Sequence, residues 1–245
     1  WGDTIRKWTE RGQMPPGVSL ADHFGYDLEL WWAFNMTADL DFVPVVLEET
    51  EETILTRDGN GAMLRRHKLH DSTPEHVGFA VTERKAWEEL IKPKLVYDPR
   101  RINFEGYRQS KALAADRQRF FCWSGVNAFE LMHPVCGHEN MLYGMVDDPE
   151  WVLDMSMTFA DLSITLMEEL FGREGWPDGI WFYEDMGFKG HSFMSPEMYR
   201  ELIFPAHKKT IDFVKSRGMP VIMHSCGYVA PLVPQLIEAG VDCLQ

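Results

Sequence analysis

The segment that decides the fold spans residues 179–245, where short apolar runs alternate with helical patterns. The runs are GIWFY (179–183), PVIM (220–223) and VDCL (241–244). After the first run, Ser195 is a typical N-cap residue with Pro196 at the first helical position, and this helical pattern ends at Gly218. A second helix is expected over residues 231–239. Strands and helices that alternate at this spacing predict a parallel sheet with right-handed crossovers.

Upstream of this segment, the sequence predicts a further strand, a long helix and a β-hairpin. RFFCW (119–123) is a candidate for a buried strand, and Asp148 is the candidate N-cap of a long helix. The turn DGNG lies between two apolar runs and predicts a hairpin, which we place as an insertion over residues 53–82. Pro205 lies inside a helical pattern, so we expect a kink there.

Composition excludes several classes of protein. The chain has 45% hydrophobic and 25% charged residues, as ordinary globular domains do. Its 24 basic and 38 acidic residues give a net charge of −14, which disfavours a nucleic-acid or anionic-membrane partner. No apolar run approaches the roughly 20 residues of a membrane span, and no cleavable signal pattern opens the chain. We therefore expect a cytoplasmic protein whose four scattered cysteines are reduced thiols.

His224 and Cys226 follow directly after the strand candidate PVIM. Residues i and i+2 of an extended segment point the same way, so the imidazole and the thiol can converge on one ion. This pair of nitrogen and sulfur donors suits zinc, although zinc normally takes three or four ligands from the protein. The alternative interpretation is a hydrogen-bonded core histidine beside a small buried hydrophobe.

Two acidic residues, Glu184 and Asp185, end the strand candidate GIWFY. Functional groups of parallel α/β folds gather at the carboxyl ends of strands, so we expect one of these carboxylates to reach a metal or substrate. Asp185 is the first candidate for this catalytic role and Glu184 the second. Paired acids in this position can equally be solvated loop charges or favourable charges at a helix N-terminus.

Six motifs resemble those of the uroporphyrinogen decarboxylase superfamily. They are GHENML (137–142), EDMG (184–187), MSPEMYR (194–200), FPAHK (204–208), HSCG (224–227) and LIEAGVD (236–242). The resemblance implies a (β/α)8 TIM barrel. Only about four βα strands are evident, so we expect residues 1–245 to be one incomplete barrel domain, truncated at both ends. His133, Cys136, His138 and Glu139 could suggest a second metal site, but the resemblance favours a turn before a helix there.

The resemblance implies two possible chemistries. One is zinc-dependent methyl transfer between a corrinoid, possibly carried on a partner protein, and a thiol or methylated small molecule. In that branch a His-x-Cys pair and a later cysteine hold zinc, so His224 and Cys226 would be ligands, with the third expected beyond residue 245. The alternative is metal-free decarboxylation of uroporphyrinogen III, whose N-terminal Met-Arg-Gln-Ala-Gly-Arg run this chain lacks. A third possibility is a non-catalytic protein that binds a corrinoid or porphyrinoid.

Overall fold

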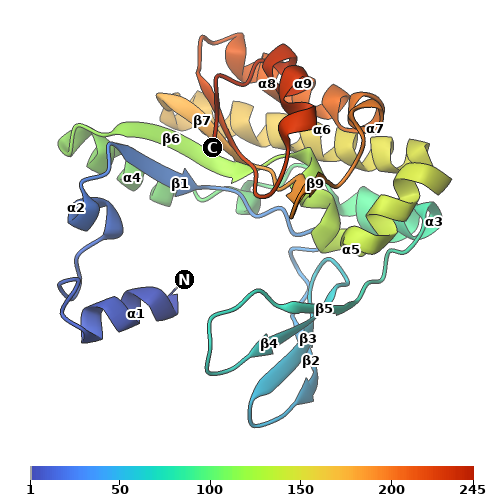
Figure 1. The fold of residues 1–245 in the computed structure, drawn as a ribbon, viewed down its shortest axis with the longest axis horizontal. Coiled ribbons are helices and arrows are strands. Elements are labelled where there is room, and N and C mark those ends of the chain that lie inside the picture. The colour runs from blue at the N-terminus through green and yellow to red at the C-terminus, as the bar shows by residue number, and fades with distance from the viewer. Residues whose placement is uncertain (1) are drawn as a thin grey trace.

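A five-stranded parallel sheet forms the centre of the computed structural model, which describes residues 2–245 (Figure 1). The strand order is β1-β6-β7-β10-β11, and every neighbouring pair is parallel. The strands are β1 (Leu28–Trp32), β6 (Phe120–Val126), β7 (Gly179–Tyr183), β10 (Val221–His224) and β11 (Cys243–Leu244). The predicted α/β class with a parallel sheet is confirmed. Strand β1 is an additional strand that the sequence analysis did not identify.

Helices connect β6 to β7, β7 to β10 and β10 to β11, and capping side chains mark the start of α4, α5, α6 and α7. The helices packed along the parallel sheet are α4 (Phe104–Asp116), α5 (Ala128–Asp147), α6 (Pro149–Glu174), α7 (Pro196–Leu202), α8 (Phe204–Lys215) and α9 (Val233–Ala239). Three helices precede them in the chain: α1 (Gly2–Glu10), α2 (Leu20–Phe24) and α3 (Arg84–Ala86), which a π-helical turn, Trp87–Ile91, continues. Asp148 caps α6 and Ser195 caps α7, as predicted. None of the helices in residues 2–245 is long and apolar enough to cross a membrane.

The kink expected at Pro205 is a complete break between two helices. Ile203 has φ −114°, and Pro205 lies in the first turn of α8, where its missing N–H is not needed. The hydroxyl of Ser156 donates a hydrogen bond of 2.9 Å to the carbonyl of Leu202. A neighbouring helix thus satisfies a carbonyl that the interrupted helix leaves free.

The predicted hairpin is the central part of a larger antiparallel sheet. This sheet has the order β2-β3-β4-β5 and comprises β2 (Val45–Glu49), β3 (Thr53–Arg57), β4 (Met63–His67) and β5 (Glu75–Gly78). Strands β3 and β4 pair across the DGNG turn, where the Asp58 carboxylate accepts from the backbone N–H groups of Asn60 and Ala62. The four strands lie beside α5, below the parallel sheet in Figure 1.

Across residues 2–245 the parallel sheet is open, because no strand pairing joins β11 to β1. Five parallel strands are present where an eightfold barrel needs eight. The closed barrel and the truncation therefore stay predictions. The structure establishes a parallel sheet in which the carboxyl ends of β6, β7 and β10 lie at one edge. The residues that follow β7 and β10 are therefore close together.

Candidate metal centre

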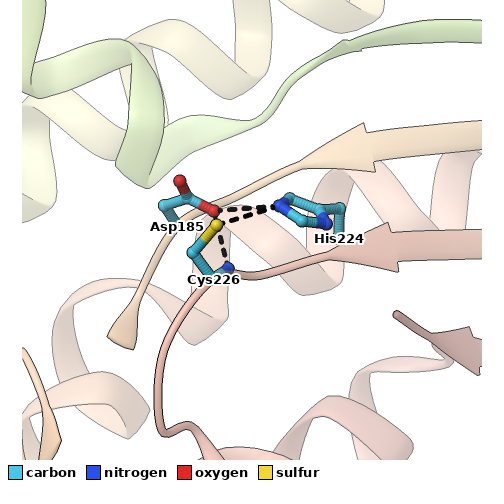
Figure 2. A group of neighbouring side chains, drawn as sticks. All are labelled: Asp185, His224 and Cys226. Carbon is cyan, nitrogen blue, oxygen red and sulfur yellow. Dashed lines mark hydrogen bonds and ion pairs between the residues drawn. The ribbon is translucent and has the colours of Figure 1, made fainter. Parts of the chain in front are cut away.

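Asp185, His224 and Cys226 come together at the carboxyl ends of β7 and β10 (Figure 2). The two strands are parallel neighbours, and His224 lies in register with Tyr183. That register brings the residues that follow each strand to the same edge of the sheet. One donor atom from each of the three side chains lies within 4.8 Å of the other two.

The distances within this cluster suit a tetrahedral metal. Nε2 of His224 is 3.3 Å from Sγ of Cys226 and 3.4 Å from Oδ1 of Asp185. Ligands of tetrahedral zinc are separated by about 3.5 Å, since each metal bond is about 2.0–2.3 Å long. Nitrogen, sulfur and carboxylate oxygen are all donors that zinc accepts, and three protein ligands leave one coordination position open for a substrate. The residues therefore fit a catalytic zinc ion.

Residues around the cluster fix the orientation of the donors. The Tyr183 hydroxyl donates to Oδ2 of Asp185 at 2.8 Å, which leaves Oδ1 directed at the cluster. The Tyr183 ring also stacks on His224, with centroids 4.9 Å apart and planes 20° apart. Nδ1 of His224 is hydrogen-bonded to the side-chain oxygen of Gln245. A proton held on Nδ1 by this acceptor leaves the Nε2 lone pair free for a metal.

A close approach of two backbone segments holds the Cys226 loop in place. Gly227 has φ +78°, and a Cβ atom there would lie 2.3 Å from the carbonyl carbon of Gly187. The backbone N–H of Tyr228 donates to the Phe188 carbonyl at 3.0 Å. Glycine is therefore required at position 227 both for its backbone conformation and for space.

The electrostatic environment favours the protonated forms of the groups near the cluster when no cation is bound. Burial raises the pKa of the Cys226 thiol, and the Asp185 carboxylate raises it further. Burial also raises the pKa of Tyr183, as does its hydrogen bond to Asp185. A bound cation reverses this effect at a thiol, because it stabilises the thiolate.

Glu184, the second predicted catalytic carboxylate, lies outside the cluster in a fully buried network. Its carboxylate accepts from the backbone N–H groups of Phe129 at 2.6 Å and Glu130 at 3.1 Å, in the first turn of α5. It also bonds Nε2 of His207 at 2.6 Å, and Nδ1 of that ring is 2.9 Å from the Tyr199 hydroxyl. Consecutive residues of an extended chain point to opposite sides, so Glu184 and Asp185 cannot both face the metal cluster.

The sequence analysis missed Tyr183 and Gln245, which contact the predicted site residues. Tyr183 carried a signal, because it lies two residues before Asp185 and two residues of an extended segment share one side. Gln245 carried none, because only the pairing of β10 with β11 brings it beside His224.

The residues of the rejected second metal site are spread over both halves of α5. Gly137 interrupts this helix with φ 78°. Cys136 is buried, and its thiol, whose pKa burial raises to about 12, hydrogen-bonds the Met132 carbonyl of its own helix. Glu139 is exposed, whereas the rings of His133 and His138 stack with centroids 4.3 Å apart.

Comparisons with known proteins relate this chain to one family and to two methyltransferases. Residues 127–245 match the family described as Uroporphyrinogen decarboxylase (URO-D). The methylated-thiol--coenzyme M methyltransferase of Methanosarcina mazei is 29% identical over 118 residues, which are 47% of this chain and 29% of that protein. A solved structure, a methyltransferase from Methanosarcina mazei, has a TM-score of 0.56 at 13% identity and covers 75% of this chain and 52% of that one.

The resemblance to the uroporphyrinogen decarboxylase superfamily that the motifs predicted is confirmed for residues 127–245, just under half of the chain. Both of these relatives are methyltransferases. The solved structure shows a shared α/β fold with a parallel sheet. The chain spans less than a third of the curated relative's length and about half of the solved chain.

Proposed function

We propose that this chain is part of a zinc-dependent methyltransferase that moves a methyl group between a corrinoid and a thiol or methylated small molecule. The observation that carries the proposal is the convergence of one oxygen, one nitrogen and one sulfur donor on the side chains of Asp185, His224 and Cys226. The methyltransferase relative, named for a methylated thiol and coenzyme M, supports this choice of substrate class. A corrinoid, free or on a partner protein, is the proposed co-substrate.

The placement of the cluster supports a further part of the proposal, that the parallel sheet belongs to a (β/α)8 barrel. Barrel enzymes of this kind carry their functional groups at the carboxyl ends of the strands, and all three donors lie there. A cysteine beyond residue 245 would complete the ligand set implied by the superfamily. In the described residues Asp185 occupies the place of a third metal ligand beside His224 and Cys226. In the metal-bound protein this ligand is either Asp185 or the later cysteine.

Each residue of the cluster has a definite part in the proposed reaction. Bound zinc would supply Lewis acidity that favours the thiolate, the nucleophilic form of a thiol. His224 and Cys226 would hold the ion, and Tyr183 would keep the Asp185 carboxylate directed at it. The ring of Tyr183 stacks on His224 and restricts its rotation. This orientation of the donors lowers the reorganisation needed when substrate binds.

The cluster argues against the metal-free alternative. A tetrapyrrole decarboxylase would need arginine side chains to pair with the carboxylates of its substrate. The hydrogen-bonding and stacking partners of the three donors in residues 2–245 are instead Tyr183 and Gln245, besides the donors themselves. None of these partners is an arginine or a lysine.

Metal analysis of the full natural protein tests the proposal. Protein purified without a metal-affinity tag should contain zinc, measured by plasma mass spectrometry, and Cys226→Ser or His224→Asn should lose it. Cys243→Ser is a matched control, because Cys243 is an exposed thiol outside the cluster and its loss should leave the zinc content unchanged. A wild-type metal content near zero that added zinc does not restore would overturn the proposal.

A further inference from the structure

A cavity of about 320 Å³ lies at the carboxyl ends of β1 and β6, beside the start of α5. Six of the side chains that line it are apolar: Trp32, Phe34, Met36, Val126, Leu131 and Pro134. Trp32 is 49% exposed, so much of its indole is free to contact a ligand. A concave and mostly apolar surface of this size is typical of a small-molecule site.

Strand register places this cavity next to the metal cluster along one edge of the sheet. Val126 is the Cα partner of Tyr183, and Tyr183 is the Cα partner of His224. Neighbouring strands are about 4.8 Å apart, so Val126 lies about 10 Å from His224 across the single strand β7. Partners in register point to the same face of a sheet, and Trp32 shares this face because its partner is Ser124, two residues before Val126. A small molecule can therefore reach from the cavity to the metal donors.

The inserted antiparallel sheet contributes one polar group to the cavity. Asn60, in the turn between β3 and β4, is 8% exposed and lines the cavity. Its Oδ1 accepts from the backbone N–H of Ala38 at 2.8 Å, which fixes the direction of the amide. Among residues 2–245 the Nδ2 group of Asn60 has no hydrogen-bond acceptor. A largely buried donor without a partner is rare, so this group is available to an acceptor on a ligand.

The cavity offers no charge to a ligand. Its remaining lining residues, Asn35 and Thr37, are uncharged as well. Arg100 and Arg101 line a neighbouring hollow, but both guanidinium groups are already bonded. Arg101 donates to the backbone carbonyls of Asn35 and Thr37, and Arg100 pairs with two aspartates. An anionic group would therefore lose its hydration in this cavity without gaining a counter-ion.

We infer that this cavity holds the body of the substrate whose sulfur binds at the metal cluster, and that it selects an uncharged molecule with an aromatic ring and a hydrogen-bond acceptor. The inference rests on the proposed function and narrows its thiol or methylated small molecule to one chemical class. The ring packs against the indole of Trp32, and Nδ2 of Asn60 donates to the acceptor. An apolar cavity of about 150 Å³ is enough to bind benzene, so this larger cavity has room for a ring and its acceptor.

Calorimetric titration of zinc-loaded full-length protein with small thiols tests the inference. The probes are 2-phenylethanethiol, its 4-methoxy derivative, which carries an acceptor oxygen, and the anion 2-mercaptoethanesulfonate. Both ring thiols should bind at least about 10-fold more tightly than the sulfonate, because they bury a ring without burying a charge. The methoxy derivative should bind more tightly than 2-phenylethanethiol. A sulfonate that binds as tightly as the ring thiols would overturn the inference.

Two variants connect this selectivity to the cavity. Trp32→Ala should weaken the binding of both ring thiols roughly 10-fold and leave that of the sulfonate unchanged. Asn60→Asp keeps an oxygen for the Ala38 N–H but removes the donor, so the advantage of the methoxy derivative should disappear. Phe120→Ala is the matched control, because Phe120 is an exposed aromatic residue at the opposite end of β6, about 20 Å from Val126. Its replacement should change none of the affinities.

The results separate this inference from the proposed function. Unchanged binding of the ring thiols to Trp32→Ala and Asn60→Asp, both with zinc bound, would overturn the role of the cavity and leave the metal centre intact. A wild-type protein that binds no zinc would overturn the proposed function and this inference with it.

Discussion

Glu184 and Asp185 are adjacent carboxylates with opposite environments. Asp185 is part-exposed at the edge of the sheet, where its oxygen lies beside a histidine nitrogen and a cysteine sulfur. Glu184 is fully buried and bonded to two backbone N–H groups and to His207. Glu184 is the first residue after β7, and Asp185 is the second. The comparison teaches that the direction of the side chain, rather than its place in a motif, separates a group of the candidate metal cluster from a group in a buried hydrogen-bond network.

The largest effect should follow from Glu184→Gln. The amide nitrogen cannot accept from the N–H groups of α5, and the bond to His207 loses its charge, so buried donors are left unpaired. Leaving a buried hydrogen-bond donor without its partner typically costs about 1–3 kcal/mol, and more when the lost partner is charged. Chemical denaturation should show a loss of this size in the free energy of unfolding. Protein that still folds should retain its zinc; a variant as stable as wild type would place Glu184 outside any structural network.

Asp185→Asn should weaken zinc binding and leave the free energy of unfolding nearly unchanged, the reverse of the result expected for Glu184→Gln. The amide keeps the size of the side chain, and its oxygen can still accept from the Cys226 backbone N–H, so the free energy of unfolding without metal should change by less than about 1 kcal/mol. Zinc affinity, measured by competition with a chromogenic chelator, should fall by more than the roughly 10–100-fold typical of outer-shell residues. Unchanged affinity would mean that another ligand takes the third position.

Of the three substitutions, Tyr183→Phe should have the smallest effect on zinc affinity and on the free energy of unfolding. It removes the hydrogen bond to Oδ2 of Asp185 but keeps the ring that stacks on His224. We expect zinc affinity to fall about 10-fold, at the lower end for an outer-shell partner, with little change in the free energy of unfolding. Tyr228→Phe is a suitable control, since this exposed tyrosine follows the cluster loop. A larger loss in the control than in Tyr183→Phe would contradict the orienting role.

Local sequence signals predicted the elements that bury apolar side chains or carry strong caps. Strands β6, β7 and β10 and the caps Asp148 and Ser195 follow from such signals. Strand β11 was predicted as well, although both of its residues are exposed. Strand β1 was missed because Leu28–Trp32 contains a glutamate and is only partly buried, so its pairing with β6 defines it. Strand β2 is exposed at every residue, and backbone pairing with β3 rather than an apolar pattern makes it a strand.

The sequence by itself determined that His224 and Cys226 share one side of the chain, because side chains of an extended segment repeat every two residues. The order of its motifs also predicted the resemblance of residues 127–245 to the superfamily. Only the tertiary structure decided that Asp185 joins the pair and that Glu184 does not. The physical reason is that parallel pairing of β7 with β10 aligns the carboxyl ends of strands about forty residues apart in the chain, a register that depends on the packing of the whole sheet.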